Sequence, residues 1–302
     1  MFNAGDCGMH SAKIVGVAGV AAGLSLGLAA CGQGGSESTA QGTGSEAAPA
    51  SDSVGQAMGQ AMGQAADTVA EGASEMASTD TGSGTGEGVL TKALDDARTA
   101  SAERTPQEIK DLWAEGIDEV AGSGIVDRAK NVGDDAPEFV LPDAVGRTVS
   151  LTDLTEKGPV VMVWYRGGWC PYCNITLKAY QDRLDEITAA GATLVAISPE
   201  VPDKSLDTQQ KNELAFSVLS DVNNGVAKRY GVVFELHEGV KEKYDEFFSL
   251  NETYGNSGGD LPLAATYVVN TDGKIVYAFL DADYTKRADP DEVMAALRGL
   301  QG

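Results

Sequence analysis

Two cysteines three residues apart carry the most specific chemistry in this sequence of 302 residues. Cys170 and Cys173 follow an apolar run, 159–165, and precede a segment, 174–190, whose apolar residues have helical spacing. This order would place both thiols at the first turn of a helix, where unpaired backbone N–H groups and the helix dipole stabilise a thiolate. The thiolate is the nucleophilic form, and the spacing lets the second sulfur close a reversible disulfide on the first. The pattern predicts a thiol redox centre.

Four residues around the cysteines are candidate supporting residues of this centre. Pro171 suits the first position of a helix, because its missing N–H costs little there. Arg166 would add positive potential, and Trp169 would shield one side of the thiols. Tyr172 completes the motif between the two cysteines.

Two other uses of a Cys-x-x-Cys pair fit the sequence less well. A zinc site needs at least two further ligands, but there is no second Cys-x-x-Cys, and His10 and His237 are the only histidines. A purely structural disulfide would close too small a loop to constrain the chain much. We therefore predict redox activity, with no metal and no cofactor.

Two pairs of acidic residues outside the motif are each consistent with more than one role. Glu235 and Glu238 flank His237, which suits a metal or base cluster but also an ordinary surface loop. Asp281 and Asp283 are consistent either with solvated strand ends or with groups near the thiols that assist proton transfer.

The first 30 residues have the order of a secretory signal. An uncharged run of Val, Ala, Gly and Leu follows Lys13, and it is too short and Gly-rich for a comfortable membrane span. It ends in Leu28-Ala-Ala-Cys31, which resembles the lipobox of bacterial lipoproteins. That resemblance implies cleavage before Cys31, its lipidation, and anchoring in a membrane of the cell envelope. Either Met1 or Met9 is consistent with the start of the chain.

A low-complexity segment, 31–88, follows the lipobox. It consists of Gly, Ser, Ala, Thr, Gln and acidic residues and has almost no large apolar side chains, so we predict a flexible tether. The whole chain has a net charge of -23, which argues against nucleic acid as a partner because no basic stripe exists to neutralise phosphates. Most of the carboxylates are read as groups that maintain solubility.

The remaining chain predicts an α/β protein with a mixed central sheet and helices on both faces, the thioredoxin fold. Residues 89–131 predict a helical extension without evident chemistry, and a capping box at Thr105–Glu108 with Pro106 at the first helical position starts its second helix. Residues 132–302 predict the thioredoxin-like domain. Its expected strands are 137–141, 148–151, 159–165, 192–198, 217–219, 265–270 and 274–279, and its expected helices are 174–190, 205–214, 226–230, 239–250 and 289–297.

The block from Val163 to Asn174, which contains Trp-Cys-Pro-Tyr-Cys, resembles the peroxiredoxin-like branch of the alkyl hydroperoxide reductase/thiol-specific antioxidant family. Four shorter segments share the resemblance: 133–139, 197–199, 218–221 and 283–285. The resemblance implies a thioredoxin fold, peroxide reduction by a cysteine, and electrons from a thioredoxin-like thiol reductant.

The resemblance also implies roles for individual positions. Typical peroxiredoxins carry Pro-x-x-x-Thr-x-x-Cys, and by spacing these three residues correspond to Arg166, Cys170 and Cys173. Those peroxiredoxins also have an Arg before a late strand, where thioredoxins have a cis-Pro. This chain has Ala264 there, with Pro262 two residues early.

Three functions follow as hypotheses. The first is a thiol-dependent peroxidase with an antioxidant role in the cell envelope, in which Cys173 forms the sulfenic acid and Cys170 resolves it. The second is a thiol-disulfide oxidoreductase acting on disulfides of exported proteins, in which Cys170 is the exposed attacking thiolate and Cys173 resolves. The third is a redox-inert lipoprotein binding module. A glutaredoxin is a less favoured assignment, because no Thr-Val-Pro glutathione site is evident.

Overall fold

The structure is a computed structural model that describes residues 88–255 and 259–301. The predicted signal peptide, Cys31 and nearly all of the predicted tether lie outside the described residues. Within these two ranges, no helix is both long enough and apolar enough to cross a membrane.

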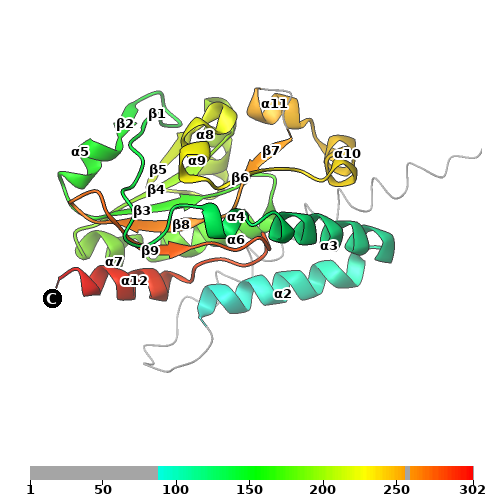
Figure 1. Cartoon of the computed structure of the whole chain (residues 1–302), viewed down its shortest axis with the longest axis horizontal. Coiled ribbons are helices and arrows are strands. Elements are labelled where there is room, and N and C mark those ends of the chain that lie inside the picture. Colours follow the sequence, from blue (N-terminus) through cyan, green and yellow to red (C-terminus); the bar gives the residue numbers. More distant parts are fainter. Residues whose placement is uncertain (1–87, 256–258, 302) are drawn as a thin grey trace, which may run out of the picture. The chain divides into compact units, whose positions relative to one another are not determined.

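Five strands form the central sheet in the order β5-β4-β3-β8-β9 (Figure 1). The central strand β3 (Val160–Trp164) pairs in parallel with β4 (Thr193–Ser198) and antiparallel with β8 (Thr266–Val269). The sheet continues with β5 (Ser217–Ser220), parallel to β4, and with β9 (Ile275–Phe279), antiparallel to β8. This mixed sheet confirms the predicted α/β class and the thioredoxin arrangement.

Alternate residues of β3 enter two apolar clusters, one on each face of the sheet. Val161 and Val163 belong to one cluster, whereas Val160, Met162 and Trp164 belong to the other. All five side chains are buried, which explains why this strand reads as a continuous apolar run.

Helices cover both faces of the sheet. Helices α2 (Val89–Arg104), α6 (Pro171–Asp182), α7 (Leu184–Ala189) and α12 (Pro290–Gly299) contribute to the first cluster. Helices α4 (Ile125–Arg128), α5 (Leu151–Thr155) and α9 (Gly225–Tyr230) contribute to the second. Two short antiparallel pairs of strands lie outside the central sheet: β1 (Val140–Pro142) with β2 (Thr148–Ser150), and β6 (Val233–Glu235) with β7 (Asp260–Pro262).

Several helix boundaries differ from the sequence prediction. The helix expected over 174–190 begins at Pro171 and is interrupted at Arg183, which separates α6 from α7. The helix expected over 205–214 is α8 (Pro202–Lys211), because Pro202 occupies its first turn. The helix expected over 239–250 is two helices, α10 (Glu238–Phe247) and α11 (Leu250–Tyr254), with extended backbone at Phe248 between them. The short elements α4, α5, β6, β7 and the 3-10 turn Val222–Asn224 were not predicted.

The predicted capping box is wrong. Helix α3 (Gln107–Gly122) begins one residue later, with Pro106 as the capping residue and no side-chain cap. The Thr105 hydroxyl instead donates to the Ser101 carbonyl at the end of α2, 2.8 Å away. Thr105 therefore ends the preceding helix instead of starting the next.

The helical extension is part of the same packing as the motif helix. Leu90, Leu94 and Ala97 of α2 enter the apolar cluster that contains both cysteines, and α2 lies against α6. Helix α3 lies against α10 in the same way. The extension therefore covers the redox motif.

Candidate active site

The two cysteines lie where β3 leads into α6, as predicted. Cys170 has extended backbone and caps the helix, and Pro171 occupies its first turn. The Cys170 carbonyl accepts hydrogen bonds from the Cys173 and Asn174 N–H groups, both at 3.1 Å. Both thiols are free, but Cys170 is only 1% exposed and Cys173 is 0% exposed. The expectation of an exposed Cys170 thiolate is therefore wrong, because the extension and several aromatic side chains cover the motif.

The environment of Cys173 favours its thiolate form. Its Sγ accepts a hydrogen bond from the Arg166 backbone N–H at 3.4 Å and from Arg287 Nη2 at 3.5 Å. Burial raises the pKa of Cys173, but the hydrogen bond from the Cys170 thiol, the charge of Arg287 and the Arg166 N–H outweigh it and hold this pKa well below its usual range. Burial and donation to Cys173 raise the pKa of Cys170. The surroundings of the pair therefore favour the thiolate at Cys173 and the proton at Cys170.

Arg287 contacts Cys173 although the two residues are 114 positions apart in the chain. It is 6% exposed, and its Nη1 donates to the backbone carbonyls of Tyr284 and Lys286. Asp283 accepts hydrogen bonds from the backbone and the hydroxyl of Thr285 in the same loop. Asp281 and Asp283 are thus bonded to groups of this same loop and stabilise its shape. Neither carboxylate has a hydrogen bond to a cysteine among the described residues.

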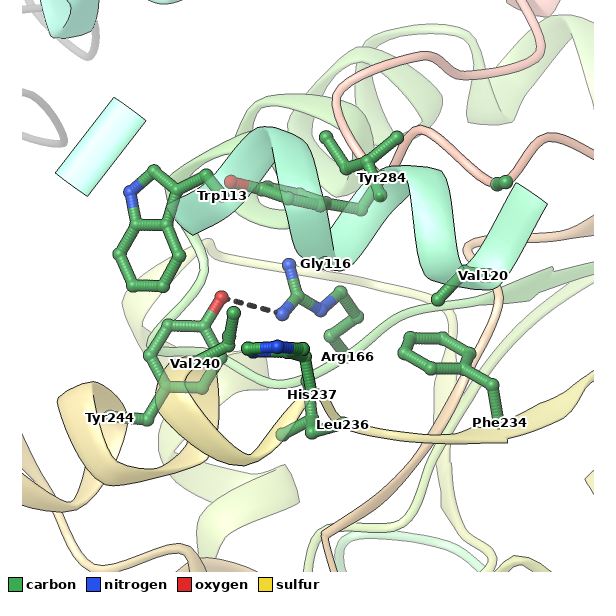
Figure 2. A pocket seen from close by; sticks show the side chains of 12 residues that line it. Trp113, Gly116, Val120, Arg166, Phe234, Leu236, His237, Val240, Tyr244 and Tyr284 are labelled. Atoms are coloured by element: carbon green, nitrogen blue, oxygen red, sulfur yellow. Dashed lines mark hydrogen bonds between the residues drawn. The ribbon is translucent and has the colours of Figure 1, made fainter. Parts of the chain in front are cut away.

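Arg166 is the second buried guanidinium of the site. It is 2% exposed, its Nη2 donates to the Tyr244 hydroxyl at 2.7 Å, and it lies over the rings of Tyr284 (4.1 Å), Trp169 (5.0 Å) and Tyr244 (5.5 Å). Burial lowers its pKa, but the interactions with Tyr244 and with the two cysteines outweigh burial and raise it. Figure 2 shows the guanidinium between Trp113, Tyr244 and Tyr284. The predicted positive potential is therefore present, on a side chain held by aromatic rings.

Trp169 covers the motif as predicted. Its Nε1 donates to the Tyr254 hydroxyl at 2.9 Å, and that hydroxyl donates to the Arg166 carbonyl at 2.7 Å. Its ring stacks on Phe248 with centroids 4.7 Å apart. Tyr172 is buried beside it and meets Tyr284 edge-on at 5.8 Å.

A buried carboxylate, Glu200, lies on the other side of the motif loop. It is 3% exposed and accepts hydrogen bonds from the Gly168 N–H (2.9 Å), the Tyr165 hydroxyl (3.0 Å) and the Thr208 hydroxyl (3.1 Å). A Cβ on Gly168 would lie 2.2 Å from the Thr208 hydroxyl, so this close approach requires glycine. Burial, the largest cause, raises the pKa of Glu200 to about 7, and the Cys173 charge adds to the effect.

Glu200→Gln is expected to make unfolding less dependent on pH. The Glu200 pKa is raised from 4.5 to about 7 in the folded protein, so the folded state binds this proton more tightly than the unfolded state. The resulting contribution to the free energy of unfolding is fully present below pH 4.5 and is lost as the pH rises through 7. The wild-type free energy of unfolding should therefore fall between pH 5 and pH 8 by roughly 3 kcal/mol more than that of the variant.

Urea unfolding at the two pH values measures this difference. Glu235→Gln, which removes an exposed carboxylate, is the matched control and should behave as the wild type. Equal pH dependence in the wild type and Glu200→Gln would contradict the prediction.

A cavity of about 110 Å³ borders Cys170. Its wall combines the motif with the extension, and the lining residues are Ala97, Ser101, Arg104, Thr105, Trp113, Arg166, Trp169, Cys170, Pro171, Tyr172, Ile175, Tyr244 and Tyr284. Five of these come from α2, α3 and their connection. The extension, for which no evident chemistry was predicted, therefore forms part of the wall of this cavity.

The predicted candidates for a metal site are not brought together. His237 Nε2 lies 3.9 Å from Glu115 of α3, and no group of three potential metal ligands occurs among the described residues. His237 instead lines a smaller cavity on the other side of Arg166.

Sequence reasoning missed Arg287, Glu200, Tyr244 and Tyr284. A signal for Glu200 existed, because it follows the buried strand β4, whose carboxyl end lies beside that of β3. No sequence signal indicated Arg287, which reaches Cys173 across 114 residues.

Comparison with known proteins identifies a family for part of the chain. Residues 132–278 match the AhpC/TSA family model, so α2 and α3 lie outside the match. The chain is 33% identical to the Mycobacterium tuberculosis protein Rv2521 over 146 residues, which is 48% of this chain and 82% of the relative. It is 31% identical to peroxiredoxin Bcp of Escherichia coli over 149 residues, 49% of this chain and 85% of that protein.

Among solved structures, Mycobacterium tuberculosis peroxidoxin BcpB is 24% identical and aligns with 57% of this chain and 99% of its own, with a TM-score of 0.45. The assignment to a family follows from the sequence matches. The chain belongs to the AhpC/TSA family and is a peroxiredoxin-like oxidoreductase with a thioredoxin fold.

Proposed function

We propose that this protein is a thiol-dependent peroxidase in which Cys173 reacts with the peroxide and Cys170 resolves the product. The observation that carries the proposal is the pair of nitrogen donors, Arg166 N–H and Arg287 Nη2, on the Cys173 sulfur. A thiolate at this position is the form that attacks a peroxide. Cys173 is also the position that corresponds by spacing to the family's reactive cysteine.

The reaction balances without a cofactor. The Cys173 thiolate attacks the terminal oxygen of the peroxide, the O–O bond breaks, and the leaving oxygen takes a proton and departs as water or an alcohol. The Cys170 sulfur then attacks the Cys173 sulfenic acid and releases water as the disulfide forms. An external dithiol reduces the disulfide by exchange, and the cycle closes.

Arg287 supplies a charge that the family normally supplies from another position. Ala264, before β8, is buried and apolar where typical peroxiredoxins have an arginine. The Arg287 guanidinium reaches the Cys173 sulfur from the loop before α12, where it stabilises negative charge on the sulfur and on the departing oxygen. In this proposal Arg287 takes the role of the family's arginine, although it lies at a different position in the sequence.

The N-terminal sequence indicates where in the cell this activity would take place. We propose that Cys31 is lipidated and anchors the enzyme in the cell envelope, where it removes peroxides with electrons from a thioredoxin-like reductant. The lipobox Leu28-Ala-Ala-Cys31 and the Gly- and Ser-rich residues that follow it support this location.

Stopped-flow mixing of the reduced protein with hydrogen peroxide tests the proposed activity. We expect loss of both thiols with one peroxide consumed per chain, at a rate constant at least about a hundredfold above that of free cysteine, because the thiolate is preformed beside a cation. A rate constant equal to that of free cysteine would contradict a peroxidase.

A second function is favoured by one observation. Cys170, and not Cys173, lines the larger cavity, so an external thiol or disulfide would meet Cys170 first. This is the geometry expected of a thiol-disulfide oxidoreductase. Rapid exchange with a protein disulfide together with slow peroxide reaction would support it.

A further inference from the structure

Arg166 separates two cavities beside the motif. The larger one, about 110 Å³, is also lined by Cys170, and the smaller one, about 30 Å³, is also lined by His237. Trp113, Tyr244 and Tyr284 line both cavities and surround the guanidinium (Figure 2). The positive group therefore lies at the wall of a space that reaches the Cys170 sulfur, the proposed partner of Cys173.

This guanidinium is only partly satisfied. Its Nη2 donates to Tyr244, but its Nε and Nη1 are buried and have no hydrogen-bond partner among the described residues. Buried N–H groups of an arginine normally have partners, because leaving them unpaired costs free energy. The aromatic rings attract the cation but cannot accept two further conventional hydrogen bonds in its plane.

The charges around the motif also leave Arg166 without a salt bridge of its own among the described residues. The Cys173 thiolate accepts from the Arg287 guanidinium, whereas Arg166 offers that sulfur only its backbone N–H. Glu200 is bonded to Gly168, Tyr165 and Thr208, and no salt bridge of either arginine occurs in the described part of the chain. Two buried cations thus share one anion, and a second anion would restore the balance.

We propose that the larger cavity binds organic hydroperoxides that carry a carboxylate, with the carboxylate on the Arg166 guanidinium and the hydroperoxide at the cysteine pair. This inference rests on the proposed peroxidase function and names the substrate class that the site selects. The carboxylate accepts hydrogen bonds from the unpartnered guanidinium nitrogens, and the aromatic walls contact the apolar body of the substrate.

The size and charge of the cavity fit this class. A volume of about 110 Å³ is small, so a short branched body fits better than a long chain. Arg104, an exposed residue of α2, also lines the cavity. In a chain of net charge -23, two arginines along one cavity provide a local attraction for an anion.

A matched pair of substrates tests the proposal. We would compare tert-butyl hydroperoxide with the hydroperoxide in which a carboxylate replaces one hydrogen of one of its methyl groups, and measure kcat/KM for each. The wild type should prefer the carboxylate by roughly tenfold or more, the size expected for a charge-assisted hydrogen bond.

The ratio of the two kcat/KM values separates recognition from reactivity. Arg166→Gln should bring the ratio close to one, even if both rates fall because Arg166 lies near the thiolate. Arg104→Gln should reduce the ratio partially, and Arg128→Gln, which removes an exposed positive charge of α4 that does not line the cavity, should leave it unchanged. A wild-type ratio near one, or a ratio unchanged in Arg166→Gln, would overturn the proposal.

A binding measurement distinguishes failure of this site from failure of the peroxidase function. The double variant Cys170→Ser/Cys173→Ser, which cannot react, would be titrated with isovalerate, the analogue that lacks the hydroperoxide group, by tryptophan fluorescence. Saturable binding that Arg166→Gln abolishes supports the carboxylate site whatever the peroxide kinetics show. No binding, or equal binding by the Arg166→Gln protein, would overturn it even if hydrogen peroxide reacts rapidly.

Discussion

Cys173→Ser is expected to abolish the rapid reaction with peroxide, whereas Cys170→Ser should leave its first step largely intact. The surroundings of Cys173 favour its thiolate, because two nitrogen donors and the Cys170 thiol all hydrogen-bond to its sulfur. Removing the nucleophile should reduce the rate constant by several orders of magnitude, to the background level. Removing Cys170 takes away one of three donors and should reduce the rate by about tenfold or less.

The products of the two variants provide the stronger evidence. Cys170→Ser should accumulate a sulfenic acid on Cys173 that a dimedone-type probe labels, because no second thiol resolves it within the chain. Mass spectrometry of the labelled peptide locates the modification. A sulfenic acid on Cys170 in the Cys173→Ser protein, formed at the wild-type rate, would reverse the assignment and favour the oxidoreductase interpretation.

Arg287→Met is expected to slow the peroxide reaction at neutral pH by roughly tenfold to a hundredfold. The guanidinium holds the pKa of Cys173 down, so its removal should raise that pKa and lower the thiolate fraction. The rate should then recover as the pH is raised, because higher pH restores the thiolate. Recovery will be incomplete if the guanidinium also stabilises the departing oxygen.

The pH dependence of the rate constant and of the ultraviolet thiolate absorbance measures both effects. Lys286→Met is the matched control, since Lys286 lies next in sequence but pairs with Asp281 at 3.3 Å and makes no contact with sulfur. The control should keep the wild-type profile. An unchanged thiolate titration in Arg287→Met would show that Arg287 does not set the charge on Cys173.

Local patterns were enough to predict much of the sheet. The run 159–165 is apolar at every position because β3 is buried on both faces, and a run of this kind is recognisable without knowledge of its neighbours. Pro171 marks the start of α6 for a similarly local reason, since a proline is tolerated in the first turn of a helix. By contrast, Thr105 and Pro106 matched a helix-start pattern that the structure does not use, because the Thr105 hydroxyl is taken by Ser101.

The candidate site was predicted only in part, for the same reason. Arg166, Trp169, Pro171 and Tyr172 are close to the cysteines in sequence and so are close in space. Tyr244 and Tyr284, which hold the Arg166 guanidinium, come from α10 and from the loop before α12. Burial of the thiols was not predicted, because it depends on the packing of α2 against α6.

The sequence by itself determined that Cys170 and Cys173 lie together at the start of a helix, because their spacing and the strand before them are local features. Only the tertiary structure decided which sulfur carries the charge and which groups surround it. That outcome depends on Arg287, which lies 114 residues beyond Cys173, and on the two extension helices that close the cavity over Arg166. Electrostatic interaction and burial depend on distance in space, and no local pattern in the chain encodes those distances.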